Sequence, residues 1–122
     1  MWPQENIPDS AAVFMRVHRT YCLEGALIPG VFRDHEGGMS VDWDRYASAE
    51  ETRQRARRPD DNGVIALGVG AVRSVEGLSV AHGPIPANRA HSQVLGEKDE
   101  ERRLKLSRLY TWKIPLGPKG PA

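Results

Sequence analysis

Cysteine is nearly absent from this sequence, because Cys22 is the only thiol among 122 residues. A single thiol cannot close an internal disulfide, nor can it build a cysteine-rich zinc site. The four histidines are His18, His35, His82 and His91, and no two of them have the close spacing of a common local metal site. We therefore expect a protein of a reducing compartment, without disulfides and without a bound metal.

Long apolar runs are also missing. Residues 1–6 lack the positive start and apolar core of a signal peptide. No apolar run approaches the roughly 18 residues that a membrane-spanning helix requires. We expect a cytoplasmic protein with no membrane partner.

An excess of charge of one sign is missing as well, because 17 Lys and Arg residues balance 16 Asp and Glu residues. Nucleic-acid-binding domains are usually plainly basic, so the charge argues against that class and leaves room only for a local patch. Acidic residues flank both basic runs, which favours solvated, salt-bridged helix faces over contacts to a phosphate backbone. The runs are Arg53, Arg55, Arg57 and Arg58, and Arg102, Arg103, Lys105 and Arg108.

The residues that are present indicate a single α+β domain. Hydrophobic residues make up 39% and charged residues 27%, which is typical of a globular protein. Alternation predicts a first strand over 13–19, with Val13, Met15 and Val17 on one face and Arg16 and His18 on the other. We predict an α+β fold with a small mixed or antiparallel sheet and two main helices at about 49–58 and 99–110. Further strands are expected over 39–43, 64–67, 78–82 and 91–95.

Capping and turn signals set the expected boundaries. Ser48 and Glu51 have capping-box spacing, and Pro59 ends that helix. Asn62 and Gly63 predict a turn, while residues 69–75 fit either a short helix or a strand. The expected organisation is a flexible lead-in over 1–11, one globular domain over 12–114 and a Pro/Gly-rich tail over 115–122.

Two segments are candidate ligand sites. His18 and Arg19 end the first strand and could together hold an anionic group, although a solvated strand end explains them as well. Asn88, Arg89 and His91 follow a proline-rich stretch that restricts the backbone, so they could be presented to a ligand. The alternative is that Asn88 caps a turn and His91 packs at a strand start.

Catalytic signatures are scarce. The sequence has no Walker A loop, no G-x-G-x-x-G and no G-x-S-x-G elbow. The segment Arg33-Asp34-His35, which leads to Ser40-Val41-Asp42, has the residue types of a hydrolase triad, but adjacency in sequence says little about geometry. A polar loop rich in turn formers is the favoured interpretation of this segment.

Two resemblances accompany these patterns. Residues 17–19, 32, 39–42 and 86–91, with the basic C-terminal helix, resemble a small uncharacterised bacterial protein family of unknown function. That resemblance spans most of residues 13–112 and implies no activity. The order of His18 or Arg19, Ser40 and His91 also resembles ADP-ribosyltransferase-like domains, which implies NAD held in a cleft lined by these residues. The chain departs from that family because no Glu stands at the late strand.

These observations lead to three functional hypotheses. The first is a small cytoplasmic accessory or protein-interaction module of a bacterial multi-protein system, with another protein as partner and no cofactor. The alternative is an ADP-ribosyltransferase-like or phosphodiester-acting enzyme, with NAD as a cofactor in the former case. Its catalytic residues would be His18, Arg19, Ser40 and His91, with Asn88 and Arg89 binding the ligand. The third is a nucleic-acid-binding module. The first hypothesis expects the imidazoles and arginines to be spread over the surface rather than gathered around one cavity.

Overall fold

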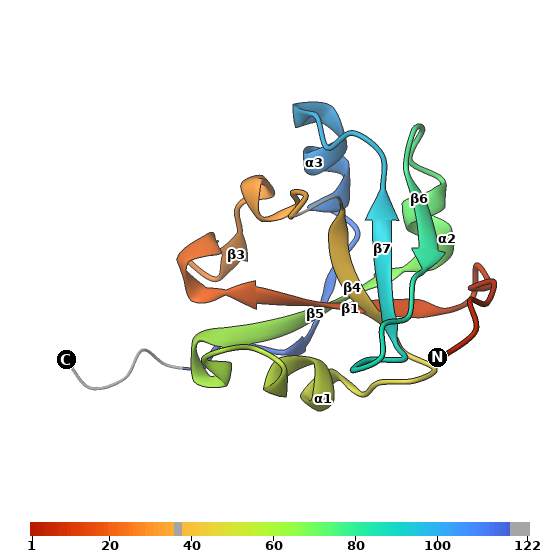
Figure 1. Ribbon diagram of the computed structural model, residues 1–122. Helices are drawn as coiled ribbons and strands as arrows, with labels where there is room; N and C mark the ends of the chain where they lie inside the picture. Colours follow the sequence, from red (N-terminus) through yellow and green to blue (C-terminus); the bar gives the residue numbers. More distant parts are fainter. Residues whose placement is uncertain (36–37, 118–122) are drawn as a thin grey trace.

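The computed structural model describes residues 1–35 and 38–117, and its centre is a six-stranded antiparallel sheet (Figure 1). Neighbouring strands of the sheet pair in the spatial order β6-β7-β4-β1-β5-β8. In that order the strands are β6 (Ser79–His82), β7 (His91–Leu95), β4 (Met39–Trp43), β1 (Ala12–His18), β5 (Asn62–Gly68) and β8 (Thr111–Ile114). The α+β class and the antiparallel sheet are confirmed.

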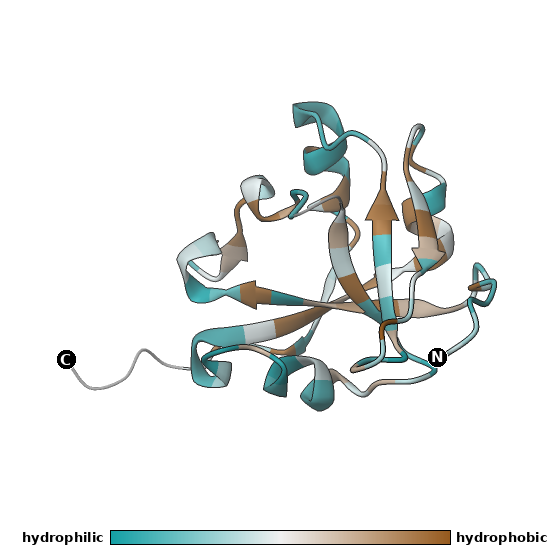
Figure 2. Ribbon diagram, in the orientation of Figure 1, coloured by the Kyte–Doolittle hydropathy of each residue, from teal (hydrophilic) through white to brown (hydrophobic). Residues whose placement is uncertain are grey.

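The described residues add a small hairpin and short helices to the sheet. The hairpin turns at Glu24 and Gly25, which both have positive φ. Figure 2 shows that α1 and α3 are largely hydrophilic, whereas β4 and β7 carry apolar stretches. The remaining elements are β2 (Cys22–Leu23), β3 (Ala26–Leu27), α1 (Ala49–Gln54), α2 (Val69–Arg73), α3 (Glu100–Leu106) and the 3-10 helices η1 (Arg19–Tyr21), η2 (Pro29–Val31) and η3 (Pro59–Asp61).

The two main helices are shorter than the sequence suggests. The capping box of α1 forms as expected, because the Glu51 N–H donates to Ser48 Oγ and the Ser48 N–H donates to the Glu51 carboxylate, both at 3.0 Å. The helix then ends at Gln54 rather than at 58, since Pro59 starts η3 and disfavours helical backbone before it. In the same way, α3 ends at Leu106 because the chain must turn to enter β8.

The expected turn at Asn62 and Gly63 is wrong. Both residues lie inside β5, where Gly63 pairs with Val17 of β1. A Cβ at Gly63 would stand 2.7 Å from the Ile114 carbonyl oxygen and 2.9 Å from the Trp112 ring. The glycine is therefore required by the close approach of β8, a strand that the sequence analysis did not predict.

Strand β1 organises both the core and the site. Its predicted inner face is confirmed, because Val13, Met15 and Val17 are buried in the hydrophobic core. β1 pairs with β5 along its whole length, but with β4 only at Val13 and Phe14. Beyond Phe14 the two strands part, as Figure 1 shows. Residues of both strands beyond this point, among them Arg16, His18 and Ser40, line an opening.

Residues 1–11, where the sequence suggests a flexible lead-in, make specific contacts with the domain. Ile7 is buried in the core, and its carbonyl oxygen accepts a hydrogen bond of 2.6 Å from Arg73. The Glu5 N–H donates to Nδ1 of the buried His82 at 3.0 Å. Most of the Pro/Gly-rich tail expected over 115–122 lies outside the described residues. None of the helices in the described part of the chain has the length and apolar character needed to cross a membrane.

Candidate functional site

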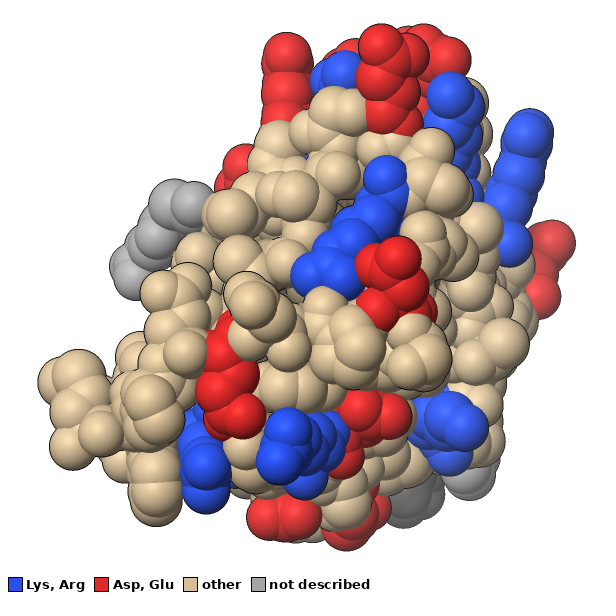
Figure 3. Space-filling view, turned by 90° about the vertical axis from the view of Figure 1, so that its right-hand side faces the viewer, with Lys and Arg blue, Asp and Glu red and all other residues tan. Residues whose placement is uncertain are grey.

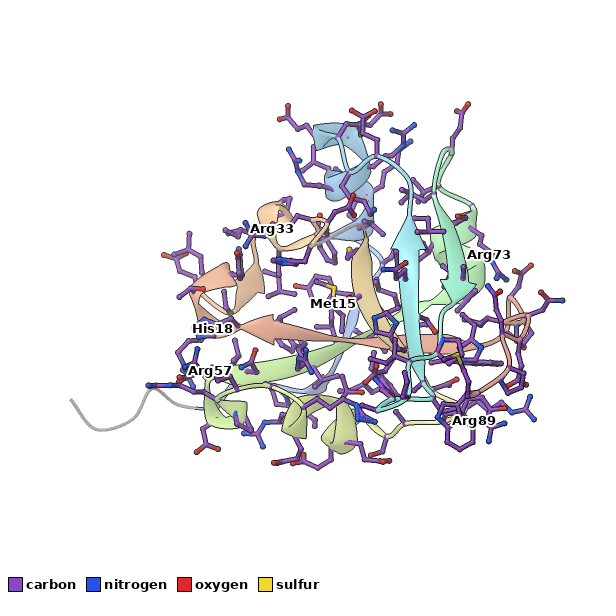
Figure 4. All side chains as sticks on the ribbon, viewed as in Figure 1. Met15, His18, Arg33, Arg57, Arg73 and Arg89 are labelled. Atoms are coloured by element: carbon purple, nitrogen blue, oxygen red, sulfur yellow. The ribbon has the colours of Figure 1, made fainter. Side chains whose placement is uncertain are left out.

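A cavity of about 660 Å³ occupies the opening between β1 and β4, and we call it the β1–β4 cavity. Met15, His18 and Arg33 surround this opening in Figure 4, whereas Arg57, Arg73 and Arg89 lie away from it. The side chains that line the cavity include Arg16, His18, Tyr21, Arg33, His35, Ser40, Asp42, Thr52, Arg55, Asn88 and His91. Its volume falls in the range of small-molecule sites, roughly 300 to 1,000 Å³.

Four of the six predicted site residues meet at this cavity. They are His18 from the end of β1, Ser40 from β4, Asn88 from the loop before β7, and His91 from the start of β7. The expectation that these groups are dispersed over the surface is wrong, because the sheet order places β7 next to β4 and β4 next to β1.

Arg19 does not join them. The chain turns into η1 directly after His18, and this turn carries Arg19 to the η3 side of the molecule. There its Nε lies 3.3 Å from the Asp61 carboxylate, and a second nitrogen donates to the Asp60 carbonyl at 2.9 Å. Arg19 is thus a structural link between η1 and η3.

Arg89 also points away from the cavity. Its guanidinium lies 4.0 Å from the centre of the Tyr46 ring and 4.8 Å from that of Trp2, both in cation–π geometry. It is also 3.8 Å from the Glu5 carboxylate. Its Nε is buried and has no hydrogen-bond partner within the described part of the chain. Arg89 therefore fastens the N-terminal segment to the domain.

Asp42 fixes one wall of the cavity. Its carboxylate accepts 2.8 Å hydrogen bonds from Thr52 Oγ1 and from Asn88 Nδ2, and it lies 3.6 Å from Nε of Arg55. The Asp42 side chain is only 8% exposed, so these partners replace the hydration that the carboxylate loses on burial. Asn88 is consequently held by Asp42, while its Oδ1 accepts from the Ala90 N–H at 3.0 Å. The bond from the Ala90 N–H to Asn88 Oδ1 agrees with the interpretation that Asn88 caps a turn.

Arginines give the cavity a positive character. Arg16, Arg33 and Arg55 line it, whereas Asp42 is the only acidic side chain lining it among the residues that the structure describes. Arg16 donates to the Thr52 carbonyl at 3.3 Å, and burial lowers its pKa while the Asp42 carboxylate raises it. Arg33 lies over the Tyr21 ring at 5.6 Å. Because Asp42 already serves Thr52, Asn88 and Arg55, a positive surplus faces the open volume.

No motif in the sequence marks these arginines as site residues. Arg16 was recognised only as part of the polar face of β1, and Arg55 as a basic residue of a helix face. Alternation along β4 could have indicated Asp42, because it places Asp42 on the same face as Ser40. Arg33 belongs to the polar segment that leads to Ser40, but nothing in the sequence signals that its side chain, which follows η2, reaches the same cavity.

The two histidines nearest the predicted site are held in opposite tautomers. Nδ1 of His18 accepts from the Thr20 N–H at 3.1 Å, so the neutral ring carries its proton on Nε2. Nδ1 of His91 lies 2.8 Å from the Gly83 carbonyl oxygen, which can only accept, so this ring carries its proton on Nδ1. The two rings therefore offer a donor at one Nε2 and an acceptor at the other.

Asp34, His35 and Ser40 do not form a hydrolase triad. The Asp34 carboxylate accepts from Nζ of Lys98 at 2.6 Å, which commits it to the segment before α3. The four histidines are also not arranged as a metal site, since no three His, Cys, Asp or Glu residues of the described chain form a group that could hold an ion. No family model, no curated protein and no solved structure matches this chain. Both resemblances given above therefore stay predictions.

Proposed function

We propose that the β1–β4 cavity binds a small molecule containing a phosphodiester or pyrophosphate group. This chemistry is shared by the two enzyme classes considered above, since NAD contains a pyrophosphate and the substrate of a phosphodiester-acting enzyme contains a phosphodiester. The observation that supports the proposal is the set of Arg16, Arg33 and Arg55 around one open volume whose single described carboxylate is already engaged. Guanidinium groups bind phosphate oxygens through charge-assisted hydrogen bonds.

The lining of the cavity supports ligand binding more strongly than it supports an accessory module or a nucleic-acid-binding module. The accessory-module hypothesis remains a prediction, but it gives no reason for an inward cluster of arginines and imidazoles. For the nucleic-acid hypothesis, the face in Figure 3 shows acidic and basic side chains interspersed, without a continuous basic surface. Several basic residues of the helix faces are neutralised locally, as in the pairs Arg53–Glu50, Arg102–Asp99 and Lys105–Glu101.

Thermal unfolding with a phosphate series tests the proposal. Pyrophosphate and ADP-ribose should raise the Tm, by on the order of 10 °C when the ligand is at about 100 times its Kd. Adenosine, which has no phosphate, should raise it much less. Arg33→Gln should weaken pyrophosphate binding by at least about tenfold, because it removes a charge-assisted hydrogen bond.

Arg57→Gln is the matched control, because Arg57 is an exposed arginine that does not line the cavity. It should bind pyrophosphate like the parent protein. Equal stabilisation by adenosine and ADP-ribose, or equal weakening in both arginine variants, would contradict a phosphate site at this cavity.

A further inference from the structure

Ser40 and His91 form a contact that ligand binding alone does not require. Ser40 Oγ lies 3.5 Å from Nε2 of His91, at the long end of hydrogen-bond distances. Because Nδ1 of His91 donates to Gly83, Nε2 of the neutral ring holds a lone pair directed at the serine hydroxyl. A hydroxyl, an imidazole base and a fixed acceptor behind the imidazole are the parts of an activated nucleophile.

The sheet holds both side chains in place. β4 pairs with β7 in a register that sets Ser40 opposite Gln93 and Asp42 opposite His91. Ser40 and His91 are therefore diagonal neighbours on one face of an antiparallel pair, close enough for such side chains to interact. The orienting carbonyl is equally fixed, since the Gly83 N–H donates back to the His91 carbonyl at 3.0 Å.

The serine is open to the cavity and to its cations. Ser40 is exposed, whereas the neighbouring Ser92 of β7 is fully buried and donates to the Ala90 carbonyl. Arg16 and Arg33 line the same volume as Ser40. They are placed to neutralise the charge on phosphoryl oxygens, which is the main task of a protein in phosphoryl transfer.

We propose that Ser40 is a catalytic nucleophile and His91 its general base, in the cleavage of a phosphate ester or anhydride bond; this rests on the proposed phosphate specificity of the cavity. Ser40 Oγ attacks phosphorus, the Oγ–P bond forms, and the bond from phosphorus to the leaving oxygen breaks. His91 Nε2 takes the serine proton and passes it to the leaving oxygen. Water then attacks the phosphoserine, giving one proton to His91, and Ser40 Oγ departs and recovers a proton from that imidazole.

A covalent probe tests the pair without knowledge of the natural substrate. Diisopropyl fluorophosphate should phosphorylate Ser40, with formation of the Oγ–P bond, cleavage of the P–F bond and release of HF. Intact-mass measurement and peptide mapping locate the adduct. His91→Gln should slow the labelling by about 100-fold or more, because the general base is lost.

Arg57→Gln is the control, because Arg57 is exposed and does not line the cavity. Its labelling rate should stay within about twofold of the parent rate. No adduct on Ser40 of the parent protein, or equal labelling in His91→Gln, would overturn the proposal. Pyrophosphate stabilisation of the same preparation separates the two failures. If the protein binds pyrophosphate but Ser40 stays unlabelled, only the proposal that Ser40 is a nucleophile is contradicted. If Ser40 is labelled but the protein does not bind pyrophosphate, the proposed phosphate specificity of the cavity is contradicted.

Discussion

A single residue, Asp42, shows why the site emerges only in three dimensions. Its two short hydrogen bonds reach Thr52 and Asn88, which lie 10 and 46 positions away along the chain. Alternation along a strand assigns Asp42 to a face, but it cannot supply partners that come from a helix and from a proline-rich loop. The same limit applies to Arg89, whose side chain turns toward Trp2 and Tyr46 rather than toward the cavity.

Glu5 provides a residue-scale prediction about pH. The Tyr46 hydroxyl donates to its carboxylate at 2.5 Å and lowers the pKa of Glu5, and Arg45 and Arg89 lower that pKa further. A carboxyl whose pKa is lower in the folded state stabilises the fold above its unfolded pKa, and this stability is lost as pH falls through the folded pKa. Tyr46→Phe should therefore lower the free energy of unfolding near neutral pH and make the loss of stability toward acid shallower.

Urea unfolding at a series of values from about pH 7 to about pH 3 measures this effect. Tyr21→Phe is the control, because Tyr21 lies beside Arg33 and is not the partner of Glu5. It should leave the slope of stability against pH unchanged. A constant difference between parent and Tyr46→Phe at all pH values would show that the hydroxyl does not stabilise the ionised carboxylate.

At the scale of elements, local signals predicted the structure well where the element depends on its own residues. The capping box at Ser48, the inner face of β1 and the strands over 39–43 and 91–95 all form as expected. The turn assigned to Asn62 and Gly63 failed because β5 continues through it, held by β1 on one side and β8 on the other. Pairing with a strand almost 50 positions later in the chain overrides a local turn preference, and no local pattern reports it.

Gly63 makes this conclusion testable. Gly63→Ala should lower the free energy of unfolding by about 2 kcal/mol, because its Cβ would collide with the backbone and the Trp112 ring of the β8 strand. Gly68→Ala is the control, because Gly68 lies at the other end of β5 and a Cβ there would stand 3.8 Å from its nearest neighbour, the Ala71 Cβ, which is an ordinary contact. That control should be neutral or stabilising by about 0.5 kcal/mol. Chemical denaturation of both variants decides the matter, and equal stability in the pair would contradict a close approach of β8 at Gly63.

At the scale of the whole molecule, the decisive feature is the parting of β1 and β4 after Phe14. It opens the volume into which His18, Ser40 and His91 project from three neighbouring strands. The sequence indicated these residues one by one, but their meeting depends on the strand order, which composition and periodicity do not determine. The convergence of the arginines that define the proposed ligand chemistry also depends on the strand order, because Arg16, Arg33 and Arg55 come from three separate elements or loops.

The central claim is that this opening is a phosphate-binding site, and NMR chemical-shift mapping with pyrophosphate tests it most directly. Titration to about 10 mM should saturate shifts of the side-chain Nε–Hε signals of Arg16 and Arg33 and of the backbone amides of Ser40 and His91. The signals of Arg57 and Arg108, which do not line the cavity, should stay in place. Saturable shifts confined to the helix faces, or no saturable shift at the cavity, would contradict the claim.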